Sequence, residues 1–353
     1  MVSETDVICI CVPTPLTKNK EPDIQYIQSV TEMLVPYLHK GQLIILESTT
    51  YPGTTEEIIL PRLEKAGLKV GQDIYLAYSP ERIDPGNKKY RIKNTPKVVG
   101  GVTERCTQLA RTLYEQVIEE EVYSVSSPRV AEMEKLLENV FRSVNIALVN
   151  EMALLCNRMG IDIWEVIEAA KTKPYGFMPF YPGPGLGGHC IPIDPFYLAW
   201  RAKEYDFNTR FIELAAEINE RMPHYVVNRV SKVLNEKKRC LNGAKILILG
   251  VSYKRDIGDL RESPVLKIIK LLEEEKADVD YHDPYIPSFV FQDRRYESVK
   301  LSRDAIKRAD IVLIATDHGS YDYEGIVEEA NLIFDTRNAT RNVARGRNKI
   351  HLL

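Results

Sequence analysis

The sequence lacks the features that would direct a chain into or across a membrane. No basic segment followed by an apolar one stands near its start, and no apolar run approaches the roughly 20 residues that span a bilayer. Long basic runs are also missing. With 47 Lys and Arg residues against 50 Asp and Glu, the net charge is −3, which argues against general nucleic-acid binding. We therefore expect a cytoplasmic protein with a small ligand.

Cysteine is scarce: the 353 residues contain six, too few and too scattered for a disulfide framework. Cys9 and Cys11 share one face of the apolar run 7–12 and lack the paired spacing of a zinc site. We predict that these two are core residues of a strand, that all the cysteines are reduced, and that the chain has no metal site.

The two common phosphate-binding fingerprints are missing as well. There is no P-loop, and the literal match Gly183-x-Gly185-x-x-Gly188 follows a proline-containing loop rather than a strand, so it does not predict dinucleotide binding. The segment that begins at Gly250 lacks the second and third glycines of such a turn.

What the sequence does have is an alternation of apolar β-type runs with amphipathic helical stretches, typical of a doubly wound parallel α/β sheet. Long helical periods then follow, and a second α/β unit opens at residue 244. We predict a truncated N-terminal Rossmann-like sheet, a central long-helix region and a C-terminal Rossmann-like domain, with domain limits 1–125, 126–238 and 239–353. The predicted strands are 6–12, 43–47, 74–78, one near 122, 244–250, 278–282, 311–315 and 332–335, and the predicted helices are 24–38, 55–65, 103–117, 127–159, 163–171, 207–238 and 264–276.

One thiol, Cys190, stands at the end of a glycine-rich loop that contains Gly185, Gly187 and Gly188. Asp194 and Pro195 are predicted to be the N-cap and first residue of the next helix, whose positive end would favour the nucleophilic thiolate. A lone cysteine is often only a small buried apolar residue. The three glycines, the adjacent His189 and the capped helix favour a reactive thiol instead.

Polar residues follow the predicted strands, where ligands of open parallel sheets bind. They are Pro13-Thr14, Ser48-Thr49, Ser79-Pro80-Glu81-Arg82, Tyr253-Lys254 and Asp335-Thr336-Arg337.

Six motifs follow one another along nearly the whole chain. They are Pro13-Thr14-Pro15, Ser48-Thr49, Pro80-Glu81, Glu134-Lys135-x-x-x-Asn139, Gly187-Gly188-x-Cys190-x-x-x-Asp194 and Lys254-x-Asp256-x-x-Asp259-x-Arg261-Glu262-Ser263-Pro264. Together and in this order they resemble the UDP-glucose/GDP-mannose dehydrogenases. The segments around Pro13 and Cys190 are most similar to the UDP-N-acetylglucosamine 6-dehydrogenase branch.

The resemblance implies an NAD-dependent oxidation of the C6 alcohol of a UDP-sugar to a carboxylate, for surface polysaccharide biosynthesis. Cys190 would attack the intermediate aldehyde to give a thiohemiacetal, whose oxidation leaves a thioester that water hydrolyses. Lys135 and Asn139, four residues apart on one helix face, would form the oxyanion hole. Asp194 would accept protons or order water, and Glu81 would activate the hydrolytic water. Thr49 completes the predicted catalytic set.

The resemblance also assigns ligands. NAD would be bound by Pro13, Thr14, Thr49 and Arg261, and the UDP-sugar by Glu81, Arg82, Lys135, Gly187, Tyr253, Lys254 and Arg337.

Residue chemistry alone leaves other interpretations open for these positions. Lys135 and Asn139 fit a solvated helix face, Asp194 a cap only, Glu81 an ion pair with Arg82, and Arg261 an ion pair with Glu262.

The chain departs from the family pattern in two ways. Pro85 stands where the family usually has a second glutamate. The first βαβ units, with their glycine turn, have no counterpart, so we expect the NAD-binding domain to be partial.

Two function hypotheses follow: the dehydrogenase, or a catalytically silent UDP-sugar-binding or dimerisation module. A cysteine hydrolase is a weaker third hypothesis, because His189 is adjacent to the thiol in sequence and so a poor base. The second long helix carries an apolar stripe from Phe211 to Val233. We expect a homodimer through the long central helix, although the chain's own domains could cover the stripe equally well.

Overall fold

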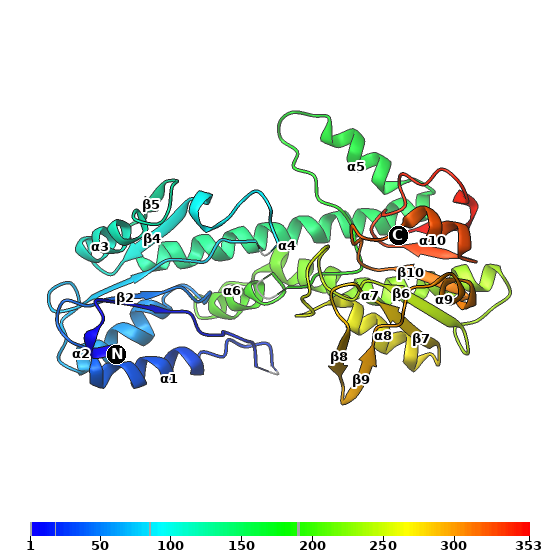
Figure 1. Ribbon diagram of the computed structural model, residues 1–353. Coiled ribbons are helices and arrows are strands. Elements are labelled where there is room, and N and C mark those ends of the chain that lie inside the picture. The colour runs from blue at the N-terminus through cyan, green and yellow to red at the C-terminus, as the bar shows by residue number, and fades with distance from the viewer. Residues whose placement is uncertain (1, 18, 85, 189–190) are drawn as a thin grey trace. The chain divides into compact units, whose positions relative to one another are not determined.

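The computed structural model describes residues 2–17, 19–84, 86–188 and 191–353 (Figure 1). His189 and Cys190 lie outside the described residues, as does Pro85. The chain forms two compact units, residues 1–141 with 193–213 and residues 142–192 with 214–353, called unit 1 and unit 2 below. The division into three domains stays a prediction.

Unit 1 is built on a mixed five-stranded sheet in the order β1-β2-β3-β4-β5. β1 to β3 run parallel, but β3 and β4 are antiparallel, so the expectation of a wholly parallel sheet is wrong for this pair. The elements of unit 1 are η1 Val2–Glu4, β1 Val7–Ile10, α1 Gln25–Leu34, η2 Val35–Tyr37, β2 Leu43–Leu46, η3 Thr55–Ile59, α2 Leu60–Lys65, β3 Tyr75–Tyr78, η4 Ile92–Asn94, β4 Lys97–Gly101, α3 Glu104–Tyr114, β5 Val122–Ser124, the first part of α4 Pro128–Met159, α6 Asp194–Lys203 and the start of α7 Arg210–Glu236.

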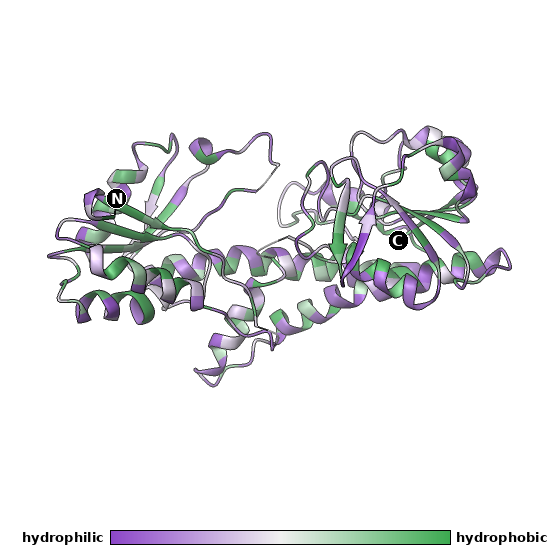
Figure 2. Ribbon diagram, turned by 60° about the horizontal axis from the view of Figure 1, so that its bottom comes forward, coloured by the Kyte–Doolittle hydropathy of each residue, from purple (hydrophilic) through white to green (hydrophobic). Residues whose placement is uncertain are grey.

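Both faces of this sheet are covered, because successive side chains of a strand point to opposite sides. Ile44 and Leu46 of β2 pack in one apolar cluster with Ile27 of α1 and Leu63 of α2. Leu43 and Ile45 pack on the other face with Ala110 of α3 and with other apolar residues. Figure 2 shows these strands as mainly hydrophobic ribbon.

Cys9 and Cys11 correct a prediction. Cys9 lies on β1, the edge strand of the sheet, and Cys11 follows directly after this strand. Both are exposed, whereas Ile10 between them is buried. The alternation along the strand was correct: Ile8 and Ile10 pack in one core cluster, and Val7, on the face of the thiols, packs in the other. The prediction fails because β1 is the edge strand, and the carboxyl end of its thiol face is left exposed.

Unit 2 contains a wholly parallel sheet in the order β12-β11-β10-β6-β7. Ile246 and Ile248 of β6 pack against α7 and α8, and Leu247 and Leu249 pack against α9 and α10. Its elements are the remainder of α4 and α7, α5 Ile163–Lys171, β6 Lys245–Leu249, α8 Pro264–Glu274, β7 Asp278–His282, β8 Ser288–Phe291, β9 Arg294–Glu297, α9 Arg303–Arg308, β10 Ile311–Ile314, α10 Tyr323–Glu329, β11 Ile333–Asp335, η5 Arg347–Lys349 and β12 Ile350–Leu352.

The apolar stripe of α7 divides at its middle. Met222, Val226, Val230 and Val233 are buried in the core of unit 2, so the alternative that the chain covers them itself is confirmed for this part. Phe211, near the start of the helix, is 79% exposed.

The long exposed stripe lies instead on α4, where sequence analysis did not place it. In unit 1 it consists of Val130, Met133, Leu137 and Phe141, and in unit 2 of Leu148, Met152, Leu155 and Met159.

Candidate active site

The N-terminal half of α4 brings three of the predicted catalytic residues together in unit 1. The side-chain amide of Asn139 donates a hydrogen bond to Asp194 Oδ2 at 2.5 Å. One turn earlier, the Lys135 ammonium donates to the backbone carbonyl of Glu81, also at 2.5 Å. Lys135, Asn139 and Asp194 are each less than a tenth exposed. The alternative of a solvated helix face is therefore wrong for Lys135 and Asn139.

Asp194 is the most perturbed carboxyl of this group. Burial raises its pKa from the ordinary 3.8 to about 7, against the Asn139 hydrogen bond and the charge of Lys135, which lower it. A carboxyl with this pKa takes up and releases a proton near neutral pH, as a general acid or base must.

The predicted capping role of Asp194 is wrong. α6 begins at Asp194 itself, Ile193 is the N-cap, and no side chain caps the helix. The carboxylate is directed to Asn139 of α4 instead of to its own backbone.

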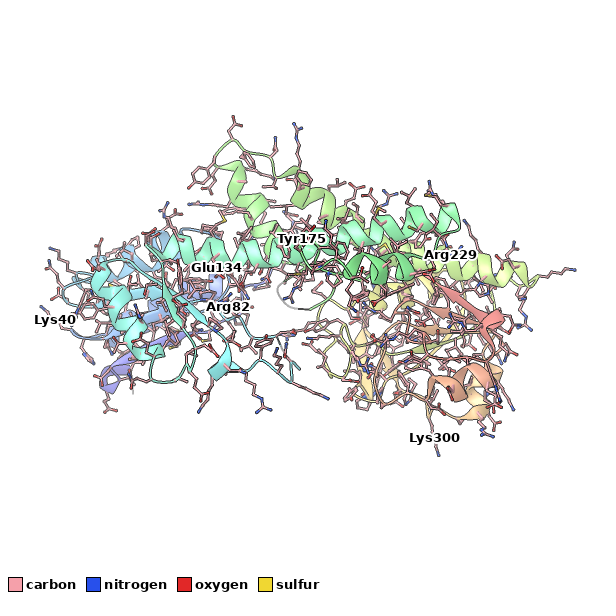
Figure 3. The ribbon with its side chains drawn as sticks, turned by 90° about the horizontal axis from the view of Figure 1, so that it is seen from above. Lys40, Arg82, Glu134, Tyr175, Arg229 and Lys300 are labelled. Atoms are coloured by element: carbon pink, nitrogen blue, oxygen red, sulfur yellow. The ribbon has the colours of Figure 1, made fainter. Side chains whose placement is uncertain are left out.

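Glu81 and Arg82 follow β3, but they do not form the ion pair that the sequence left open. The Glu81 carboxylate is exposed and accepts from the backbone N–H of Ile83 at 2.6 Å. Arg82 donates to Glu138 and lies 3.6 Å from Glu134, both of α4. Figure 3 labels Arg82 and Glu134 side by side.

The carboxyl pair on α4 was missed by sequence analysis. Glu134 and Glu138 lie one turn apart and share Arg82. Burial, and next the charge of Glu138, raise the pKa of Glu134 to about 7. Burial, the largest single effect, would raise the pKa of Glu138, but the hydrogen bonds with Arg82 and Glu134 and the charges of Arg82 and Lys135 together lower it. The available signal was the i, i+4 spacing of two glutamates beside Lys135 and Asn139.

The predicted NAD ligands of unit 1 lie where the parallel strands β1 and β2 end. Ser48 joins the two ends, accepting from Val12 N–H at 2.9 Å and donating to the Val12 carbonyl at 2.7 Å. Thr14 is buried, and its carbonyl accepts from the Tyr197 hydroxyl of α6. The Thr49 hydroxyl has no hydrogen-bond partner among the described residues.

These groups fit part of a dinucleotide, because hydroxyls at the carboxyl ends of parallel strands can bind its ribose and phosphate groups. Pro13, Thr14 and Thr49 are the residues of unit 1 that would hold it. Arg261, the fourth predicted NAD ligand, belongs to unit 2 and binds Asp259 at 2.6 Å rather than Glu262.

In unit 2 the glycine-rich loop packs on the segment that follows β6. A Cβ on Gly187 would come within 2.5 Å of Tyr253 Cβ, and Gly188, with φ +95°, lies against the Tyr253 ring. The Gly188 N–H also donates to the Arg261 carbonyl at 2.9 Å. These glycines are required for close approach and positive φ, as the sequence predicted. Nothing is described of Cys190 itself.

Arg337 and Lys254 have different surroundings. The Arg337 guanidinium donates to the Ala315 carbonyl at 3.2 Å. It also packs against Gly183, where an added Cβ would lie only 2.5 Å from Arg337 Nη1. Arg337 therefore supports the glycine-rich loop in this structure. Lys254 is half-buried beside Tyr253.

Two buried asparagines that sequence analysis did not single out also hold this loop. Gly183 N–H donates to Asn150 Oδ1 of α4, and the Asn150 amide donates to Asn219 Oδ1 of α7, both at 2.9 Å. Asn219 then donates to the Ser143 carbonyl at 3.1 Å. Their signal in the sequence was weak: two amides on helix faces that are otherwise apolar.

Two kinds of feature are absent from the described residues. No group of three or more His, Cys, Asp or Glu side chains there could hold a metal ion. Within the same residues, no helix is both long and apolar enough to cross a membrane.

Comparison with known proteins gives a consistent family match along the chain. Models of the UDP-glucose/GDP-mannose dehydrogenase family match residues 1–118 (NAD binding domain), 129–221 (central domain) and 247–342 (UDP binding domain). The NAD-binding domain is thus present rather than lacking. The expectation that its first βαβ units are missing stays a prediction.

Curated relatives and a solved structure agree with this match. The chain is 38% identical over 323 residues to a UDP-N-acetyl-D-glucosamine 6-dehydrogenase of Pseudomonas aeruginosa, covering 91% of this chain and 73% of that protein. It is 36% identical over 346 residues to a UDP-N-acetyl-D-mannosamine dehydrogenase of Methanocaldococcus jannaschii, covering 95% and 76%. The structure of a UDP-D-ManNAc dehydrogenase from Pyrococcus horikoshii superimposes with a TM-score of 0.86 at 35% identity, over 95% of this chain and 78% of that one.

Proposed function

We propose that this chain, which belongs to the UDP-glucose/GDP-mannose dehydrogenase family, oxidises the C6 alcohol of UDP-N-acetylglucosamine, or of a related UDP-hexose, to the uronate. By its family membership the chain is an NAD-dependent UDP-sugar dehydrogenase. The product would serve surface polysaccharide biosynthesis. The alternative of a catalytically silent sugar-binding module is not favoured, since the NAD-binding domain is matched.

One observation supports the chemistry most directly: the buried Asp194, with its pKa raised to about 7, hydrogen-bonded to Asn139 and four residues after Cys190 in the chain. A thiol that attacks an aldehyde must lose its proton, and the carbonyl oxygen must gain one. A carboxyl that titrates near neutrality can serve such transfers.

In the proposed reaction Cys190 Sγ bonds to the aldehyde carbon to form a thiohemiacetal. NAD⁺, when bound, supplies the hydride acceptor for both oxidations, that of the C6 alcohol to the aldehyde and that of the thiohemiacetal to the thioester. The resulting thioester is hydrolysed by water, which releases the carboxylate and restores the thiol. Lys135 and Asn139 supply a cation and an amide N–H for the oxyanion of the tetrahedral species. Each makes one hydrogen bond in this structure, and because the ammonium has three N–H donors and the amide two, each can also donate to the substrate oxygen.

Glu81 has an exposed carboxylate, accessible to a water molecule, and we keep it as the proposed base for hydrolysis. Arg82 is less suited to the substrate than the sequence predicted, because its guanidinium is held by Glu134 and Glu138. Lys254, Tyr253 and Arg337 remain the proposed UDP ligands.

A homodimer is part of the proposal. The exposed apolar stripe on each part of α4 has the 3- and 4-residue spacing of a helix face that packs against another helix. A second copy of the chain is the proposed occupant.

The test is a steady-state assay of the purified chain with NAD⁺ and, separately, UDP-N-acetylglucosamine, UDP-N-acetylmannosamine and UDP-glucose. We expect two NADH per uronate formed, fastest with an N-acetylhexosamine. Cys190→Ala should abolish uronate formation, while the control Cys240→Ala, which removes an exposed thiol, should not. An unchanged uronate yield from Cys190→Ala would refute the thioester route.

A further inference from the structure

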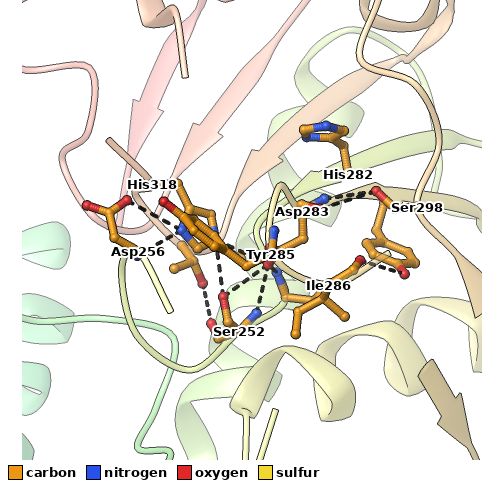
Figure 4. A network of polar contacts seen from close by, with 12 residues as sticks. Ser252, Asp256, His282, Asp283, Tyr285, Ile286, Ser298 and His318 are labelled. Carbon is orange, nitrogen blue, oxygen red and sulfur yellow. Dashed lines mark hydrogen bonds and ion pairs between the residues drawn. The ribbon is translucent and has the colours of Figure 1, made fainter. Parts of the chain in front are cut away.

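Unit 2 contains a buried polar network that none of the roles above uses. It joins the residues that follow β6, β7 and β10 at their carboxyl ends (Figure 4). In the sheet order, β7 lies on one side of β6 and β10 on the other, so the strands, although all parallel, are added in opposite directions from β6 outward, and the order reverses between β6 and β10. Such a reversal opens the crevice in which doubly wound sheets bind their ligands. The network therefore lies beneath the expected nucleotide site.

Asp283, directly after β7, is the acceptor at the centre. Its Oδ2 accepts from Val251 N–H at 2.8 Å, from Ser252 N–H at 3.1 Å and from the Ser252 hydroxyl at 3.0 Å. His318 Nε2 lies 3.1 Å from the same oxygen. Burial would raise the pKa of Asp283, but these hydrogen bonds, that of His318 first, lower it to about 2. The carboxylate is therefore a fixed negative charge.

His318 is fully buried, and one of its ring nitrogens faces a hydrogen-bond donor while the other faces an acceptor. Nδ1 lies 3.0 Å from the backbone N–H of Asp256. A backbone N–H can only donate, so Nδ1 must accept and carries no proton. The ring proton is then on Nε2, where Asp283 Oδ2 and the Ser252 hydroxyl oxygen, each 3.1 Å away, can accept it. The network thus selects one neutral tautomer of His318.

The residue that His318 holds, Asp256, has a left-handed backbone with φ +59°, which is unfavourable for a residue with a Cβ. Its backbone N–H is fixed by His318, and its Oδ1 accepts from Gly319 N–H at 2.7 Å. The loop is closed further on by Tyr253 N–H, which donates to the Asp259 carbonyl at 3.0 Å. Lys254 lies inside this closed loop, two residues before the strained position.

We propose that His318 is a positioning residue for the nucleotide site, which acts by accepting the Asp256 N–H and so fixes the turn that carries Lys254. The inference rests on the proposed assignment of UDP to the Lys254 loop. It differs from a purely structural role, in which His318 would only fill space and satisfy Asp283.

Two substitutions separate these roles, because each keeps one half of the imidazole. In His318→Asn the side-chain oxygen stands near the position of Nδ1 and can still accept from Asp256. In His318→Gln the amide reaches the position of Nε2 and can still donate to Asp283, but the Asp256 N–H loses its acceptor. Both leave a similar gap in the ring site, so we expect similar losses of thermal stability.

The experiment is calorimetric titration of the full chain and both variants with UDP alone, with melting temperatures measured in parallel. We expect His318→Gln to bind UDP about tenfold more weakly than the wild type, the effect of one lost hydrogen bond and a loosened turn, and His318→Asn to stay within about threefold. Equal UDP affinities in the two variants, or weaker binding by His318→Asn, would overturn the proposal while leaving the proposed function intact. A wild type that does not bind UDP would overturn both.

A wild-type measurement decides the matter if a variant does not fold. Amide exchange of the segments 253–259 and 316–319 should slow together when UDP is added, since the His318 to Asp256 contact couples them. Exchange that slows in neither segment, or in 253–259 alone, would contradict the coupling.

Discussion

Substitution of Asp194 by Asn tests the electrostatics of the candidate active site without any substrate. Asparagine has nearly the shape of the protonated carboxyl and cannot ionise. The Asp194 carboxyl has an ordinary pKa of 3.8 and a folded-state pKa of about 7, raised by burial. Between these values the folded protein binds the proton more tightly than the unfolded chain. The stability that Asp194 contributes is therefore complete below about pH 4 and is lost as the pH rises through 7.

The size of the effect follows from the same values. At about 1.4 kcal/mol per pH unit, ionisation of Asp194 costs the folded wild type about 3 kcal/mol between pH 5 and pH 8, most of it below pH 7. Because the other titrating groups are common to both proteins, the difference in unfolding free energy between Asp194→Asn and the wild type isolates this cost. We expect the variant to gain about 3 kcal/mol relative to the wild type over that range.

The assay can be restricted to unit 1, which matters because a chain with two units need not unfold in a single step. The chain has two tryptophans, Trp164 in unit 2 and Trp200 in unit 1. Trp200 lies on α6, the helix that begins at Asp194, and packs on Tyr51 with ring centroids 5.1 Å apart. Urea unfolding followed by fluorescence in a Trp164→Phe background therefore reports on unit 1.

The control is Asp278→Asn, which removes an exposed carboxylate of unit 2 and should leave the pH dependence unchanged. A second variant, Asn139→Leu, removes a hydrogen bond that lowers the pKa of Asp194 and should move the midpoint of the pH effect upward by about one unit or more. A stability difference that stays constant from pH 5 to pH 8, or that shifts in favour of the wild type, would refute the assignment of a raised pKa to Asp194.

Two further predictions use binding and assembly. In calorimetric titrations, Lys254→Ala should weaken UDP-sugar binding about tenfold or more, because a charge-assisted phosphate contact is lost. Its affinity for NAD⁺ should stay within about threefold of the wild type. The control Lys300→Ala, at an exposed lysine, should stay within about threefold for both ligands. Equal losses for the two ligands would contradict the assignment of Lys254. Leu148→Asp, at a side chain 53% exposed on α4, should convert the proposed dimer to monomer in light-scattering measurements, whereas Glu151→Gln on the same helix should not. A Leu148→Asp protein that remains dimeric would exclude this face as the interface.

Local sequence patterns were enough for most of the secondary structure. The helical period predicted 127–159 and 163–171, and α4 and α5 occupy almost those bounds. The β-type runs of the second α/β unit became β6, β7, β10 and β11. Four strands were missed. They are β4, whose end is Gly100-Gly101, the hairpin β8–β9, whose turn Gln292-Asp293 takes positive φ without a glycine, and the three-residue β12.

The candidate site was predicted in part. The order of the motifs identified the family, and the i, i+4 spacing of Lys135 and Asn139 placed both on one helix face. Their acceptors were not predictable from spacing, because Asp194 and Glu81 are more than fifty residues away in sequence. For the same reason Arg82 was expected to pair with its neighbour Glu81, whereas folding brings Glu134 and Glu138 to it.

The sequence by itself determined which chemical groups this protein has and the class of fold that carries them, since both depend on residue type and short-range periodicity. Only the tertiary structure decided what those groups do to one another. Burial of Asp194, the single tautomer of His318 and the exposed stripe of α4 all arise from contacts between distant segments, and no local pattern encodes the removal of a carboxyl from water or the side of a helix that is left uncovered.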